Sequence, residues 1–320
     1  MKNITKLIKL TLCVATMAIM FSCSDDDSTQ NNSISGIASR NSDLTTLVEA
    51  LDRADLVQTL DQSGNYTVFA PTNAAFSTFL TANGFASIND VPVATLKEIL
   101  LNHVINSVNY STDLSTGYVK TLGKGNASTT NTLSMYISLN SGVTVNGISV
   151  RLNGVSSVTA ADIEASNGVV HVVNAVIGLP TVVTHATANP NFSSLVGALT
   201  GSGQPDFVGI LSGTTNSPFT VFAPSNSAFT AFETENPGTL ASLTTAQLTS
   251  VLSYHVVTGA NVLSTGIPTT PITTYESGTF TIVGIQITDE ADRQTDIIDV
   301  DIQSSNGVIH VVENILLPTL

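Results

Sequence analysis

The sequence predicts an α+β fold made of two tandem homologous domains, and the main reason is an internal repeat. The ten residues TVFAPTNAAF at 67–76 return as TVFAPSNSAF at 220–229, with eight of the ten positions identical. Two more matched pairs follow in the same order: LLNHVINS at 100–107 with LSYHVVTG at 252–259, and DIEASNGVVHVV at 162–173 with DIQSSNGVIHVV at 301–312. Three ordered motifs found twice indicate duplicated units of about 140 residues, a size that can form its own core.

Each copy of the first motif predicts a strand that turns into a helix. Thr67–Phe69 is a short β-rich run, and Pro71 should end it because proline has no N–H for a strand ladder. Thr72 or Asn73 can then cap a helix. The buried face of that helix, at i, i+3 and i+4, would consist of Phe76, Phe79 and Leu80. The second copy repeats the pattern with Ser225, Asn226, Phe229 and Phe232.

Apolar spacing predicts further helices. Residues 43–60 carry apolar side chains at a helical period and predict one or two short amphipathic helices. Another helix leads into each histidine motif, because apolar residues and the histidine share one stripe. The stripe residues are Leu96, Ile99, Leu100, His103 and Val104 in the first copy, and Leu248, Val251, Leu252, His255 and Val256 in the second. Each histidine is therefore expected on the apolar side of a helix, near its end.

The third motif predicts a β-hairpin in each copy. Its Asn-Gly pair favours positive φ in a tight turn. The valine-rich runs Val169–Val173 and Val308–Val312 follow the turn and predict half-buried strands. These strands contain His171 and His310.

The two copies differ in length between the second and third motifs. The first copy has about 13 extra residues there, and the segment 115–131 is rich in Gly, Ser, Thr and Asn. This composition predicts that the extra residues form a loop. The junction between the copies, near residues 179–189, is short and predicts a restricted angle between the domains.

Taken together, the three motifs resemble those of the fasciclin domain. They are similar to its first conserved motif, its tyrosine–histidine motif and its second conserved motif, over residues 37–180 and 182–320. The resemblance implies two small β-sandwiches or wedges, each with packed helices. The chain departs from the family pattern at Asn102, where a tyrosine is expected, and at Asn73 and Asn226, where many relatives have aspartate.

The N-terminus predicts export and lipidation. Residues 1–22 have a basic start and an apolar run too short for a comfortable transmembrane helix, which predicts a signal peptide. The following Cys23 resembles the lipidated residue of a bacterial lipobox; an ordinary secretory signal with an incidental cysteine is the alternative. Residues 23–36 then form an acidic, flexible tether. Its Cys-Ser-Asp-Asp-Asp start is similar to the tag of surface-exposed outer-membrane lipoproteins of the Bacteroidetes type.

Composition narrows the classes of partner. The chain has 10 Lys and Arg against 24 Asp and Glu, a net charge of −14, which argues against nucleic acid and anionic headgroups. The only cysteine besides Cys23 is Cys13, inside the predicted signal peptide, so no disulfide is expected. No segment after residue 21 is long and apolar enough to span a bilayer, and attachment to the outer membrane would depend on the lipid.

The histidines are the first candidates for chemistry. Four of the five lie at matched positions of the repeat. A pair in each copy could hold a metal or act as a general base, but a histidine on an apolar helix stripe or in a valine strand more often belongs to the framework. The sequence has no mature cysteine, no G-x-S-x-G, no H-E-x-x-H and no P-loop. We therefore expect no enzyme activity, no cofactor and no metal.

Carboxylates are the second candidates. Asp162 and Asp301 each precede their histidine by nine residues, a spacing that could pair carboxylate with imidazole and hold the hairpin. With His171, His310, Asn73 and Asn226, these aspartates are expected to be framework residues. An acidic run between residues 289 and 301 has oxygen ligands that suit calcium, but no EF-hand pattern, and whether it binds calcium stays open.

The sequence therefore predicts a non-enzymatic surface lipoprotein that contacts an extracellular protein or polysaccharide, as in adhesion or a matrix. In animal relatives the tyrosine–histidine region is associated with receptor binding, so the resemblance makes Tyr254, His255 and, in part, His103 candidate binding residues. Two alternatives remain: a small-ligand carrier or hydrolase of an outer-membrane uptake system, and a structural spacer. The ligand, the oligomeric state and the number of domains that bind are open.

Overall fold

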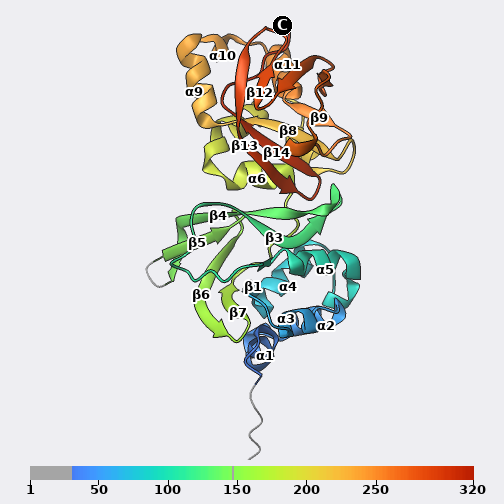
Figure 1. Cartoon of the computed structure of the whole chain (residues 1–320), viewed down its shortest axis with the longest axis vertical. Helices are drawn as coiled ribbons and strands as arrows, with labels where there is room; N and C mark the ends of the chain where they lie inside the picture. The colour runs from blue at the N-terminus through green and yellow to red at the C-terminus, as the bar shows by residue number, and fades with distance from the viewer. Residues whose placement is uncertain (1–30, 146–147) are drawn as a thin grey trace, which may run out of the picture. The chain divides into compact units, whose positions relative to one another are not determined.

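Each half of the chain folds into a seven-stranded mixed sheet with helices packed against it, as the computed structural model shows for residues 31–145 and 148–320 (Figure 1). The helices of domain one are α1 (Ile34–Arg40), η1 (Ser42–Leu44), α2 (Thr45–Arg53), α3 (Val57–Asp61), α4 (Asn73–Ala82), η2 (Ile88–Asp90) and α5 (Val93–Leu101). Its strands are β1 (Tyr66–Pro71), β2 (Val104–Ile105), β3 (Gly117–Gly125), β4 (Ser128–Val145), β5 (Ile148–Leu152), β6 (Ser156–Ala165) and β7 (Gly168–Val173).

Domain two repeats this order. Its helices are α6 (Val182–Ala188), η3 (Pro190–Phe192), α7 (Ser193–Leu199), α8 (Phe207–Ser212), α9 (Asn226–Glu235), α10 (Thr239–Ser242), α11 (Thr245–Tyr254) and η4 (Ser264–Gly266). Its strands are β8 (Phe219–Pro224), β9 (Val256–Thr258), β10 (Ile272–Thr273), β11 (Thr279–Val283), β12 (Gln286–Thr288), β13 (Gln294–Ser304) and β14 (Gly307–Val312).

The sheets have the same strand order, which confirms the predicted duplication at the level of the fold. Domain one runs β2-β1-β7-β6-β5-β4-β3, and domain two runs β9-β8-β14-β13-β12-β11-β10 when read in the same direction. The central pair is parallel in both domains, and the other pairs are antiparallel. In that pair the first motif lies beside the third, with Phe69 opposite His171 and Phe222 opposite His310.

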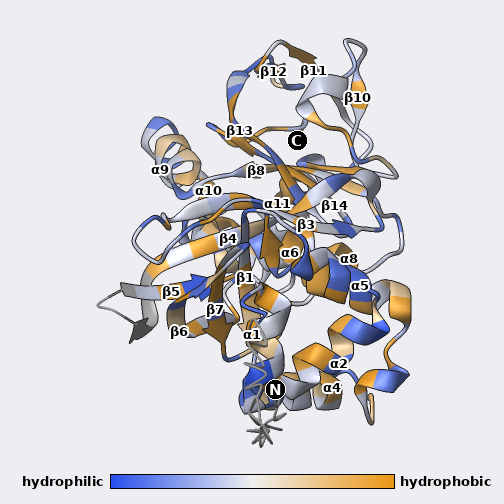
Figure 2. Cartoon of the chain, turned by 60° about the horizontal axis from the view of Figure 1, so that its bottom comes forward, coloured by the Kyte–Doolittle hydropathy of each residue, from blue (hydrophilic) through white to orange (hydrophobic). Residues whose placement is uncertain are grey.

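Each domain has a hydrophobic cluster on each side of its central strands, and domain two has a third, smaller cluster around Phe232, Val251 and Ile315. In domain one, the helices cover one face, where Val68 and Val170 pack against Leu47 and Phe76. On the other face, Phe69 from β1 belongs to a second cluster with residues of β4, β5 and β7. The sheet thus folds over itself into the expected wedge. Figure 2 shows α2 as hydrophobic on one side and hydrophilic on the other, as the predicted amphipathic helices require.

The strand–turn–helix corner forms as predicted. Strand β1 ends at Pro71, and the side chain of Thr72 caps α4 by accepting a hydrogen bond from the Ala75 N–H (3.2 Å). The prediction for the histidine motif was partly wrong, because α5 ends at Leu101, two residues before His103. The chain leaves the helix there since Val104 must begin β2, which pairs with β1.

The predicted loop at 115–131 is instead strand β3 and the start of β4. The glycines in this segment allow close backbone approach rather than a flexible loop. A Cβ at Gly123 would lie 2.7 Å from the backbone nitrogen of Asn102, and one at Gly125 would lie 2.2 Å from the Cα of Ser305. Composition alone does not separate these two uses of glycine.

The β3–β4 hairpin of domain one contacts β13 and the third-motif turn of domain two. Ala127 N–H donates to the Ser305 carbonyl (2.9 Å), and Lys120 Nζ donates to the Asp301 carbonyl (2.7 Å). Gln303 N–H donates to Ser134 Oγ (3.0 Å). Residues 32–320 form a single compact unit, so the short junction is supported by the residues inserted in domain one.

The predicted signal peptide, most of the acidic tether and the lipidation residue Cys23 lie outside the described residues. The last residues of the predicted tether, 34–36, are not flexible chain but the buried start of α1, because Ser33 caps that helix. Within the part of the chain that the structure describes, no helix has the length and apolar character needed to cross a bilayer.

Candidate functional site

The two histidines of the second motif are buried and fully hydrogen-bonded. His103 is 2% exposed; its Nδ1 donates to the Ile99 carbonyl (2.7 Å), and its Nε2 accepts from the Ile177 N–H (2.9 Å). His255 repeats this arrangement with Val251 and Leu316 at the same two distances. Each ring therefore ties the end of a helix to the segment after the third motif. Because both ring nitrogens are occupied, neither is available to a ligand in this conformation.

The histidines of the third motif are also enclosed by the backbone. His171 Nε2 donates to the Asn109 carbonyl (2.9 Å), and its Nδ1 accepts from the Asp162 N–H (3.2 Å). His310 makes the matching contacts with Val262 (2.8 Å) and Asp301 (3.5 Å). Both rings are 0% exposed.

Burial keeps these imidazoles neutral. It lowers the pKa of His103 and of His255 to about 4, opposed by the hydrogen bond to a carbonyl. Burial also lowers the pKa of His171 and of His310, against the opposing effects of a carbonyl hydrogen bond and the nearby aspartates. A histidine that is neutral, buried and saturated with backbone partners supports the framework assignment made from the sequence.

The two aspartates of the third motif serve the backbone and not the imidazole directly. The Asp162 carboxylate accepts from Ser111 N–H (2.7 Å) and Ser111 Oγ (2.6 Å), and Asp301 makes the same pair with Ser264 (2.8 and 2.6 Å). The nearest carboxylate oxygen of Asp162 lies 3.9 Å from His171 Nδ1. Asp162 and Asp301 both have positive φ, 62° and 61°, so each sits at a bulge that its own carboxylate helps to hold.

The asparagines of the first motif join helices. Asn73 Oδ1 accepts from the Thr46 N–H (2.9 Å), and its Nδ2 donates to the Ser42 carbonyl (2.8 Å). Asn226 makes the equivalent contacts with Ser194 (2.9 Å) and Pro190 (2.9 Å). An asparagine can donate and accept at once, which an aspartate in its place could not do.

The turn asparagines of the third motif, which sequence reasoning treated only as turn formers, have a larger role. Asn167 Oδ1 accepts from the Ile34 N–H (2.9 Å), and its Nδ2 donates to the carbonyls of Leu60 and Gln62 (both 2.8 Å). Asn306 repeats this with residues of α6 and α8. The sequence Ser-Asn-Gly is identical in the two copies, and this identity is the signal from which the additional role of the asparagine could have been predicted.

The candidate binding residue Tyr254 is completely buried. Its hydroxyl donates to the Thr279 carbonyl (2.6 Å) and accepts from the Glu290 N–H (3.1 Å). In domain one the shorter Asn102 is likewise buried, and it bonds to Gly178 and Thr121. Tyr254, His255 and His103 therefore support the surface residues from inside the domain, and a ligand cannot touch them without a conformational change.

The first two carboxylates of the acidic run at 289–301 hold nearby backbone. Asp289 accepts from the N–H groups of Ala291, Arg293 and Leu317 (2.9–3.0 Å). Glu290 accepts from Thr279 and Thr319, and these backbone hydrogen bonds lower its pKa. Across the described ranges, no three His, Cys, Asp or Glu side chains gather closely enough to hold a metal ion.

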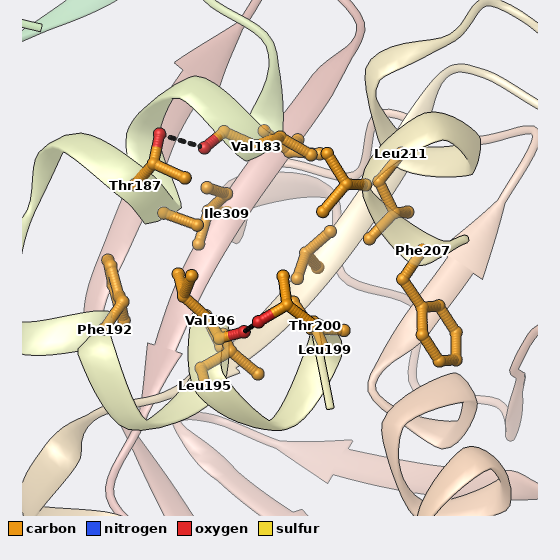
Figure 3. Close-up of a pocket in the computed structure, with 15 residues that line it drawn as sticks. Val183, Thr187, Phe192, Leu195, Val196, Leu199, Thr200, Phe207, Leu211 and Ile309 are labelled. Carbon is orange, nitrogen blue, oxygen red and sulfur yellow. Dashed lines mark hydrogen bonds between the residues drawn. The ribbon is translucent and has the colours of Figure 1, made fainter. Parts of the chain in front are cut away.

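Domain two contains one apolar opening, which we call the domain-two groove (Figure 3). Helices α6, α7 and α8 surround it, and β8 and β14 form its floor. The wall residues include Phe192, Val196, Leu199, Phe207 and Leu211, and the floor residues are Val221, Ala223 and Ile309. The groove encloses about 500 Å³ of space, part of it open to solvent. Its two hydroxyl groups, of Thr187 and Thr200, donate to carbonyls of their own helices (2.9 and 2.8 Å).

Comparison with known proteins identifies the same two units. The fasciclin domain model matches residues 42–180 and 190–318. Protein sll1735 of Synechocystis sp. is 32% identical over 142 residues, which cover 43% of this chain and 98% of that protein. Human periostin is 26% identical over 292 residues, 86% of this chain and 31% of periostin. The structure of a domain pair from the insect cell adhesion molecule fasciclin I has the same fold, with a TM-score of 0.50, 20% identity and coverage of 84% of this chain and 92% of the pair.

Proposed function

The chain belongs to the fasciclin family, and we propose that it is a non-enzymatic binding protein that joins a bacterial surface to extracellular protein or polysaccharide. The observation that carries this proposal is the state of the motif side chains. The four matched histidines are buried, neutral and bonded to backbone, so the residues that recur in both domains stabilise a scaffold. Recognition then falls to the outer surfaces of the two domains.

The family relationship supports an adhesive role. One relative in structure is described as a cell adhesion molecule and also has two such domains in tandem. Two weak sites on one rigid chain gain avidity through their effective concentration, which suits contact with repetitive polymers and matrices. The chain's net charge of −14 favours basic or neutral partners over polyanions.

Exposed apolar side chains of domain two mark a surface to test. Val283 ends β11 and Ile285 lies in the β11–β12 turn, and they are 79% and 59% exposed. Large apolar side chains that stay this exposed are common at sites of contact with other molecules. Val155, between β5 and β6 of domain one, is 57% exposed and offers a control of similar exposure.

The test is binding of residues 24–320 to arrays of glycans and matrix proteins, followed by attachment assays with a deletion strain. We expect saturable binding to at least one class, and weaker binding after Val283→Ser with Ile285→Ser than after Val155→Ser. No bound class on either array, together with unchanged attachment of the deletion strain, would refute the proposal.

Membrane anchoring through Cys23 forms a separate part of the proposal. It is supported by the lipobox-like Ser22-Cys23 and the acidic residues that follow. Cys23→Ser should move the protein from the membrane fraction to the soluble fraction and abolish its labelling by an alkyne-tagged fatty acid. Unchanged labelling of the variant would show that Cys23 is not the lipidated residue.

A further inference from the structure

We propose that the domain-two groove binds the end of an uncharged hydrocarbon chain, such as that of a long-chain alcohol. This site goes beyond the surface contacts proposed above and does not depend on them. Its evidence lies in the lining of the groove, in the charges around it and in the comparison with the matched space of domain one.

The lining selects an apolar occupant. The groove is walled by aliphatic and aromatic side chains, and its floor is the valine, alanine and isoleucine surface of the sheet. Figure 3 shows that both threonine hydroxyls are engaged with carbonyls of their own helices, Thr187 with Val183 and Thr200 with Val196. Water in such a space would lack the two to four polar partners that hold buried water in proteins. A hydrocarbon chain has no polar groups, so it loses no hydrogen bonds with water when it enters the groove.

The charges exclude an acidic headgroup. The sequence from residue 152 to residue 292 contains no lysine or arginine, and Arg293 is the single such residue of domain two. The one titratable side chain on α6, His185, is buried, and burial lowers its pKa to about 4, so it stays neutral. None of the residues that line the groove is charged. The lysine that acts electrostatically on His185, Lys120 of domain one, is engaged with the Asp301 carbonyl (2.7 Å), and the protein has a net charge of −14. The occupant is therefore uncharged.

The matching space in domain one is narrower. This counterpart, lined by residues including Ile34, Leu51 and Val170, encloses about 370 Å³ against about 500 Å³ in the domain-two groove, and the part of the space that the centre of a water-sized sphere can enter falls from about 40 Å³ to about 10 Å³. On this measure a single water needs roughly 10–15 Å³. The helices differ accordingly: α2 and α3 are joined by residues 54–56, whereas α7 and α8 are joined by residues 200–206, which include Gly201 and Gly203. The longer link between α7 and α8 thus occurs in the domain that has the wider opening.

The depth of the groove favours a narrow chain over a protein side chain. Its floor is formed by buried β8 and β14, whereas its rim is formed by exposed Thr187, Thr200 and Val208. An occupant that contacts both must pass between three helices. A linear alkyl chain can do this with its terminal carbons while its polar end remains in water.

The experiment measures binding of 1-hexanol, 1-octanol and 1-decanol to residues 24–320 by calorimetry, with octanoate as the charged counterpart of 1-octanol. Affinity should rise roughly fourfold with each added methylene until the groove is full, and octanoate should bind more weakly than 1-octanol. Affinity that does not depend on chain length, or octanoate that binds as well as 1-octanol, would overturn the proposal.

Matched variants locate the site. Val196→Phe should fill the groove and weaken 1-octanol binding at least tenfold, while Val48→Phe, at the equivalent position in domain one, should leave it unchanged. Methyl NMR of the unaltered protein gives a readout that needs no variant. 1-Octanol should shift the methyl signals of Val196, Leu199 and Ile309, but not those of Val48, Leu51 and Val170. Equal shifts in both sets, or none in the first, would refute the site.

Discussion

The two domains share one framework and differ where the framework meets its surroundings. Both hold a buried histidine just after the helix that leads into the second motif and an aspartate at a bulge of the third, with nearly equal distances. They differ at Tyr254 against Asn102, in the length of the strand pair at the edge of the sheet, and in the width of the space under the first helices. Interactions with the backbone were thus preserved after duplication, while edges and cavities diverged.

The largest expected effect tests the shared framework. His103→Ala and His255→Ala should each lower the free energy of unfolding by about 3 kcal/mol, because each leaves a buried N–H and a buried carbonyl unpaired and creates a cavity. Chemical denaturation followed by far-UV circular dichroism checks this. Similar losses in the two domains would support equivalent roles, whereas a loss below about 1 kcal/mol in either would break the comparison.

A smaller effect is expected at the position where the motifs differ. Tyr254→Asn should cost about 2–3 kcal/mol, since it empties the space beside Phe280 and removes the hydroxyl bond to Thr279. The reverse change, Asn102→Tyr, should cost about 1–3 kcal/mol by overpacking, because β3 approaches Asn102 closely at Gly123. If Asn102→Tyr were stabilising, β3 could not be the reason that domain one lacks the tyrosine.

The contact of the β3–β4 hairpin with domain two can be tested at Tyr118. Tyr118 of β3 packs with the cluster of domain two, edge-on to His185 with ring centroids 5.4 Å apart, and Asn189 donates to its hydroxyl (3.3 Å). Tyr118→Ala should cost about 2 kcal/mol and split thermal unfolding, measured by calorimetry, into two transitions. The half-exposed Tyr110 of the same domain serves as control, and Tyr110→Ala should leave the unfolding profile unchanged.

The smallest effect at neutral pH is expected at His185, and this effect should grow in acid. Its folded pKa is about 4 against 6.5 for the free side chain, so its neutral form stabilises the fold above pH 6.5, and this contribution is lost as the pH falls towards 4. Domain one has Ile37 at the matched position. His185→Ile should change stability by less than about 1 kcal/mol at pH 7.5, since Nδ1 of His185 has no partner. It should reduce the loss of stability between pH 6.5 and 4 without abolishing it, because burial also lowers the pKa of the other four histidines. An unchanged pH profile in denaturation experiments would contradict this assignment.

The sequence predicted the corner and the hairpin because their signals are local. Pro71 ends a strand, Thr72 caps a helix and Ser-Asn-Gly makes a turn within a few residues, and the duplication showed each of them twice. The turn itself is formed by Ser-Asn, and neither Asn167 nor Asn306 has the positive φ expected from the Asn-Gly pair. The segment 115–131 was predicted wrongly, because its glycines allow close contact with the backbone of Asn102 and Ser305, which are distant in sequence. The domain-two groove was not predicted for the same reason: it arises from the spacing of three helices, and no single residue marks it.

The junction between the domains has a mechanical consequence. Pro180 ends domain one, its carbonyl accepts from the Ser305 N–H of domain two (2.6 Å), and α6 begins only two residues later. A pulling force along the chain would therefore find no flexible linker to extend at this point and would act at once on the hydrogen bonds across the junction. Under tension the two domains should extend as one stiff unit, in contrast to domains that are joined by a flexible linker.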